Sequence, residues 1–130
     1  MTEATRLKSL RIALLVIGLF AIFGFWPLTV LWPSGWVWHA EGRSYYLEML
    51  IGIYATLGFF LVLAARNPLA SLSLIWFTVW SSIVHGGLMA VQSFSGEHHM
   101  GHLWGDVLAL LLVAAVLAAL TPRQTKAVSA

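Results

Sequence analysis

The sequence contains no cysteine among its 130 residues. Disulfides, thiolate metal sites, iron–sulfur clusters and covalently attached c-type haem all need cysteine, so the sequence excludes them. Charge is also scarce, because 9% of the residues are charged against about 25% in soluble domains. The composition is therefore not that of a soluble domain. The few bases behind the net charge of +2 do not indicate a nucleic-acid partner.

Apolar residues, in contrast, make up 60% of the chain and gather in four long runs. A membrane-spanning helix needs roughly 20 such residues. We therefore predict an all-α fold, a four-transmembrane-helix bundle that forms one membrane domain over residues 1–130. The predicted spans cover about residues 10–31, 44–65, 69–92 and 102–120. We expect the first span to be retained rather than cleaved as a signal peptide, because no small-residue cleavage site follows it.

Several residues punctuate these spans. Pro27 is predicted to kink or end the first helix, and Ser44 is a plausible N-cap of the second. The sequence Arg66-Asn67-Pro68 indicates a tight turn between the second and third spans. Most tryptophans fall near span ends, where amphipathic rings anchor at the membrane interface. The predicted anchors are Trp26, Trp32, Trp36, Trp38 and Trp104.

The basic residues predict the orientation of the chain. In the four-span arrangement only Arg43 falls on one side, and the other six bases fall on the opposite side. The positive-inside rule therefore predicts that both termini are cytoplasmic and that the chain is a multi-pass protein of the bacterial inner membrane. The six bases are Arg6, Lys8, Arg11, Arg66, Arg123 and Lys126.

Ionisable residues inside a span are candidates for function, because they are costly in hydrocarbon. Glu48, His85 and Asp106 fall in three different spans, roughly 5–10 Å below the outer interface at about 1.5 Å per residue. We expect them to converge inside the bundle. Helical periodicity predicts three inward-facing stripes. These are Thr78, Ser82, His85, Met89 and Gln92; Tyr45, Glu48 and Gly52; and His98, His102 and Asp106.

Three roles fit this cluster. In the first, its members hydrogen-bond each other and fix helix packing. In the second, they bind a transition metal such as zinc, copper or iron, which imidazole and carboxylate ligands suit. The candidate metal ligands are Glu48, His85, His98, His102 and Asp106. In the third, His85 and His102 bind haem, and Gly86 and Gly87 leave space beside His85.

Three short stretches also occur in a characteristic order. They are Tyr45-x-x-Glu48-Met49-x-x-Gly52-x-Tyr54, Ala64-Ala65-Arg66-Asn67-Pro68 and Ser81-Ser82-x-x-His85-x-x-x-Met89. In this order they resemble a family of small bacterial four-helix integral membrane proteins, a domain of unknown function. The resemblance covers roughly residues 44–120 and implies the four-span fold without implying an activity.

No nucleophile elbow, phosphate-binding loop or zinc-protease motif occurs in the sequence, so no enzyme class is indicated. We predict a small non-catalytic integral membrane protein, surrounded by lipid, that serves as an accessory or interaction subunit beside other membrane subunits or copies of itself. The alternative is a metal- or haem-binding protein that uses His85 with Glu48, His102 and Asp106. A third hypothesis gives His85 the role of proton acceptor in a small enzyme or channel.

Overall fold

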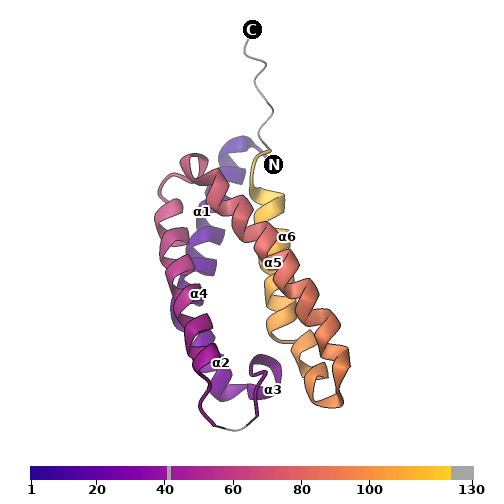
Figure 1. The fold of residues 1–130 in the computed structure, drawn as a ribbon. Helices are drawn as coiled ribbons and strands as arrows, with labels where there is room; N and C mark the ends of the chain where they lie inside the picture. Colours follow the sequence, from indigo (N-terminus) through magenta and orange to yellow (C-terminus); the bar gives the residue numbers. More distant parts are fainter. Residues whose placement is uncertain (41, 124–130) are drawn as a thin grey trace.

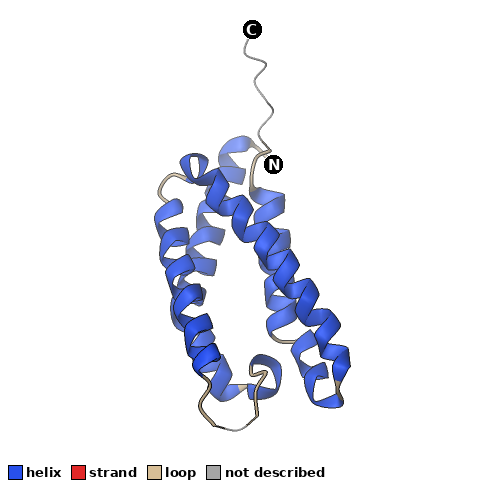
Figure 2. Ribbon diagram, in the orientation of Figure 1, coloured by secondary structure: helices blue, strands red, loops and turns tan. Residues whose placement is uncertain are grey.

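A computed structural model describes residues 1–40 and 42–123 of the chain. Every regular element in this part of the chain is helical, as Figure 2 shows. Four helical stretches there are long and apolar enough to cross a membrane, namely Glu3–Leu31, Tyr45–Ala64, Pro68–Ser95 and Glu97–Leu120. The predicted all-α fold with four spans is confirmed. Glu41 and Lys126 lie outside the described residues.

The first span is one continuous helical stretch with an irregular middle. It consists of α1 (Glu3–Leu19), a π-helical turn η1 (Phe20–Gly24) and α2 (Phe25–Leu31). Pro27 therefore does not end the helix. A proline lacks the N–H that would bond back along the helix, and the wider π-helical turn directly before α2 is one of the usual irregularities of long helices.

The second span begins after a short helix and an extended connection. The short helix is α3 (Pro33–Trp36), and the second span is α4 (Tyr45–Ala64). The Ser44 side chain accepts a hydrogen bond from the Leu47 backbone N–H at 3.2 Å. This contact satisfies one of the free N–H groups at the start of α4, so the predicted N-cap is confirmed.

The third and fourth spans are each extended by 3-10 turns. The third consists of η2 (Pro68–Ser71), α5 (Leu72–Gln92) and η3 (Ser93–Ser95), and the fourth of η4 (Glu97–Leu103) and α6 (Asp106–Leu120). Asp106 is thus the first residue of α6 and not one turn inside a longer α-helix. Directly before it, Gly105 has φ −100° and ψ −110°, outside the α-helical region. The chain also packs closely here, because a Cβ at Gly101 or Gly105 would collide with the backbone of α3.

The helices form two pairs. α4 packs along α1, and α5 packs along α6, while α1 also contacts α6. α4 and α5 have no comparable packing and meet mainly through their turn η2, so the two pairs separate away from that turn (Figure 1). The N-terminus and the C-terminal end of α6 lie at the same end of the molecule as the η2 turn, and α3 lies at the opposite end (Figure 1).

The end that carries the termini is closed by an apolar core that all four spans share. Its buried members are Leu10, Leu14, Leu61, Ala64, Ala65, Ile75, Val79, Ala114 and Leu117. At the same end, the Arg6 guanidinium donates hydrogen bonds to the carbonyls of Ala119, Leu120 and Thr121, at 2.9 to 3.2 Å. These contacts satisfy free carbonyls at the C-terminus of α6, where a positive charge is also favourable.

Candidate functional site

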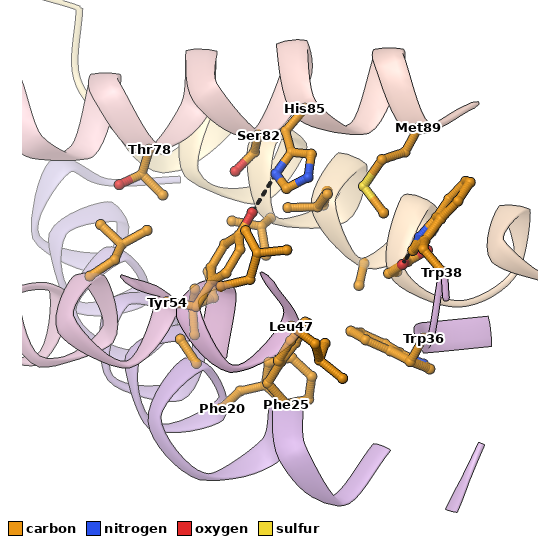
Figure 3. Close-up of a pocket in the computed structure, with 18 of the residues that line it drawn as sticks. Phe20, Phe25, Trp36, Trp38, Leu47, Tyr54, Thr78, Ser82, His85 and Met89 are labelled. Atoms are coloured by element: carbon orange, nitrogen blue, oxygen red, sulfur yellow. Dashed lines mark hydrogen bonds between the residues drawn. The ribbon is translucent and has the colours of Figure 1, made fainter. Parts of the chain in front are cut away.

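A cavity of about 280 Å³ lies between the two helix pairs, beyond the shared core. Its wall is formed mainly by apolar and aromatic side chains, with a few polar groups among them, as Figure 3 shows. Each span and the short helix α3 contribute to this wall. Representative residues are Phe20 from η1, Phe25 from α2, Trp36 from α3, Leu47 and Tyr54 from α4, Ser82 and His85 from α5, and Leu110 from α6.

An aromatic cluster forms one side of the cavity. The Phe25 ring stacks on Tyr54 with centroids 5.7 Å apart and meets the edge of Trp36 at 5.6 Å. Phe20 also meets Trp36, at 6.0 Å. The π-helical turn explains this arrangement, because its i, i+5 spacing brings Phe20 and Phe25 to one side. Trp36 is only 5% exposed and belongs to the cavity wall, so its predicted role as an interface anchor is wrong.

A first polar bridge crosses the cavity between α4 and α5. The Tyr54 hydroxyl lies 2.5 Å from Nδ1 of His85, and the dashed line in Figure 3 marks this hydrogen bond. It joins two helices that otherwise have little contact along their length. The other ring nitrogen of His85, Nε2, has no hydrogen-bond partner among the described residues, and the ring points into the cavity (Figure 3).

The predicted polar stripe on α5 faces this cavity. Thr78, Ser82, His85 and Met89 all line it, whereas Gln92 is exposed. The Thr78 hydroxyl donates to the Leu74 carbonyl at 2.9 Å, so it is satisfied within its own helix. The inward orientation of the stripe is therefore correct over its first four members and fails only at the end of α5.

A second polar bridge closes the end of the cavity that lies away from the termini. Trp38 Nε1 donates to Oδ2 of Asp106 at 2.7 Å, and the Val107 backbone N–H donates to Oδ1 at 2.9 Å. Nδ1 of His102 lies 3.1 Å from Oδ1, and the Trp38 ring stacks on His102 with centroids 3.9 Å apart. A buried carboxyl group needs such partners. The bridge fixes the α3–α4 connection to α6, so Trp38 is not an interface anchor.

Glu48 lies apart from both bridges. Its exposed side chain pairs with Arg43 at 2.6 Å, and the hydrogen bond from this carboxylate raises the pKa of the Arg43 guanidinium. The predicted inward stripe of Tyr45, Glu48 and Gly52 is wrong, because all three are exposed. Tyr54 is the inward polar residue of α4. It lies six positions after Glu48, which places the two side chains about 120° apart around a helix with 3.6 residues per turn.

Of the predicted metal and haem ligands, the structure brings only His102 and Asp106 together among the described residues. His98 is exposed, His85 contacts Tyr54, and His102 contacts Asp106. Among the described residues, no three histidine, aspartate or glutamate side chains are placed to share a metal ion. A Cβ at Gly86 would lie 3.3 Å from side-chain atoms of Leu110 and Leu111. Gly86 therefore allows α5 and α6 to pack closely and does not open space beside His85, whereas nothing lies within 4 Å of a Cβ at the exposed Gly87.

The fold and the site define a class: a helical protein with four membrane-length spans and an apolar cavity that one polar bridge crosses and a second closes at one end. Residues 4–128 match DUF6632, a family of unknown function, and the chain belongs to this family. The predicted resemblance to a family of unknown function is thus confirmed. No curated protein and no solved structure matches the chain.

Proposed function

We propose that the protein is a non-catalytic membrane protein that binds an apolar small molecule in the cavity between its two helix pairs. The observation that carries this proposal is the cavity itself, about 280 Å³ in volume and walled by apolar and aromatic side chains. Small-molecule sites have this character, and their volumes begin at about 300 Å³. A dry apolar cavity of about 150 Å³ is already large enough for benzene.

The separation of the helix pairs supports the same function. Apolar surfaces in a protein interior close on one another until few voids remain. Here α4 and α5 stay apart, and the two bridges through Tyr54–His85 and Trp38–Asp106 span the space between the pairs. A bound apolar molecule would supply the van der Waals contacts that the separated walls lack.

The proposal also covers the membrane in which the protein lies, its orientation there and its role beside other subunits. We propose that the chain is a multi-pass protein of the bacterial inner membrane with cytoplasmic termini, because Arg6, Lys8, Arg11 and Arg66 gather at the end that carries the termini. The positive-inside rule predicts that this end faces the cytoplasm. We also propose an accessory role beside other membrane subunits or further copies of the chain. The predicted metal or haem function is not adopted, since only two of its candidate ligands lie together in the described part of the chain.

Photolabelling in native membranes tests ligand binding. The probe is a long-chain alkyl diazirine, and peptide mass spectrometry locates the labelled residues. We expect saturable labelling of the cavity wall, which excess unlabelled alkane removes, over a non-saturable background on lipid-facing residues. Ala109→Phe, which fills the cavity, should reduce the saturable part at least about tenfold. Ala115→Phe, on the exposed face of the same helix, is the matched control.

Two results would contradict the proposal. One is labelling of the wild-type cavity wall that does not saturate. The other is an equal loss of saturable labelling in Ala109→Phe and Ala115→Phe, since only Ala109 lines the cavity.

A further inference from the structure

Most polar groups of the cavity wall are already occupied, which leaves few to recognise a ligand. The Thr78 hydroxyl is bonded within α5, and the Asp106 carboxyl group is bonded by Trp38, His102 and Val107. Nε2 of His85 and the nearby Ser82 hydroxyl make no hydrogen bond within the described residues. They lie on one face of α5 and form one polar point in the wall. The indole N–H of Trp36, which also lines the cavity and is buried without a hydrogen-bond partner among the described residues, is a second.

The charge of the wall restricts the ligand to neutral molecules. Among the described residues, no lysine or arginine lines the cavity. The one carboxyl group there, Asp106, is 4% exposed and turned toward its own partners. An ionised phosphate or carboxylate brought to this depth would find no permanently charged lysine or arginine, since the basic side chains of the wall are the imidazoles of His39 and His85. Burial of an unpaired charge is costly.

The Tyr54–His85 bridge can offer either a donor or an acceptor to a ligand. When the Tyr54 hydroxyl donates to Nδ1, the hydrogen of the neutral imidazole resides on Nε2, which then donates to a carbonyl oxygen. When Nδ1–H donates to the Tyr54 oxygen, Nε2 is the acceptor and receives a bond from a hydroxyl group. The 2.5 Å contact allows both arrangements, so one site accommodates a carbonyl and a hydroxyl at the same position.

The aromatic cluster adds a preference for a flat ring. Phe25, stacked on Tyr54, and Trp36, which meets the edges of Phe20 and Phe25, lie together on one side of the cavity. Offset-stacked and edge-to-face contacts with a planar ligand are favourable on such a wall.

From these features together we infer that the ligand is a membrane quinone, bound in the carbonyl or the hydroxyl form with one ring oxygen at Nε2 of His85. This inference rests on the proposed binding function. A quinone is neutral, planar and soluble in the bilayer, and its two forms differ at the oxygen that the Tyr54–His85 bridge can recognise in either state.

Competition in the photolabelling assay tests this inference. The competitors are decyl-benzoquinone, its quinol, palmitate and an alkane of similar length. We expect both ring compounds to displace the alkyl diazirine at concentrations at least about tenfold lower than palmitate or the alkane. His85→Phe and Tyr54→Phe keep a ring but remove polar atoms, and each should weaken displacement by the quinone about 3- to 10-fold. Displacement by the alkane, which makes no hydrogen bond, should weaken less than displacement by the quinone in both variants.

The matched control is Tyr45→Phe, which removes an exposed hydroxyl from the same helix and should leave every competitor unaffected. Saturable labelling that the quinone and the alkane displace equally would overturn the quinone inference and leave the cavity as an apolar site. Palmitate as the strongest competitor would overturn the argument from charge. Absence of saturable labelling would instead overturn the proposed function, so the two failures are distinguishable.

Discussion

At the scale of single residues, the Trp38 side chain should contribute to the stability of the protein through its hydrogen bond to Asp106 at the end of the cavity. Its indole N–H is one of three donors to the buried Asp106 carboxyl group. Trp38→Phe keeps an aromatic ring beside His102, although a smaller one, and removes this donor. We expect the free energy of unfolding in mild detergent to fall by about 1–3 kcal/mol, the cost of leaving a buried polar group without its partner.

The comparison for Trp38→Phe is Trp104→Phe, because Trp104 is 72% exposed. Trp104→Phe should change the free energy of unfolding by no more than about 0.5 kcal/mol. Equal stability losses in the two variants, measured by denaturant titration followed by circular dichroism, would show that the Asp106 bond contributes nothing beyond the loss of an indole group.

The two polar bridges show what sequence reasoning reaches at this scale. The His102–Asp106 contact follows from i, i+4 spacing, and the inward face of α5 follows from its periodicity. Trp38 and Tyr54 were not recognised as partners, because their contacts join residues 68 and 31 positions apart. A tryptophan or tyrosine near a span end is assigned to the interface by default. The position of Tyr54 well inside a span, away from the membrane interface, is a signal in the sequence that its hydroxyl needs a partner within the bundle.

At the scale of the elements, a pair of glycines fixes the approach of α1 to α4. A Cβ at Gly58 would lie 2.5 Å from the Gly18 carbonyl oxygen and 2.9 Å from the Ala21 Cβ. Backbone atoms cannot yield as a flexible side chain does, so the two helices would have to separate. We expect Gly58→Ala to lower the free energy of unfolding by about 1–3 kcal/mol, the usual cost of overpacking, in a thermal or denaturant titration in detergent.

Gly52→Ala on the same helix is the control, because nothing lies within 4 Å of a Cβ at this position. Alanine is the better helix former by about 1 kcal/mol, so Gly52→Ala should be neutral or stabilising. If Gly58→Ala is as well tolerated as Gly52→Ala, the close approach at Gly18 does not limit the packing of α1 against α4.

The spans themselves were predictable because length and hydropathy determine them, and the Ser44 cap has a local sequence signal. The π-helical turn at Phe20–Gly24 and the 3-10 segment at Glu97–Leu103 were not predicted. The second of these depends on packing between α3 and Gly101 and Gly105, which are distant in sequence from α3. Hydropathy carries no information about such contacts, so it cannot predict where the backbone departs from a regular α-helix.

At the scale of the whole molecule, the arrangement in two pairs also lay beyond the sequence. In a membrane all lipid-facing and many buried positions are apolar, so hydropathy does not distinguish which helices pack together. The separation of α4 from α5, and with it the cavity, follows from side-chain packing throughout the bundle. The cavity could therefore be found only from the fold, whereas the sequence could predict the four-span bundle.

Orientation is the remaining property of the whole molecule that can be tested directly, because the chain has no cysteine and single-cysteine variants give no background. Asn67 lies in the turn between α4 and α5, at the end that carries the termini, and Ser95 lies at the opposite end; both are exposed. With cytoplasmic termini, a membrane-impermeant maleimide should label Ser95→Cys in intact spheroplasts and leave Asn67→Cys unlabelled, while both react after lysis. The reverse pattern would place the termini outside, against the distribution of basic residues, and labelling of both sites in intact cells would rule out a single orientation.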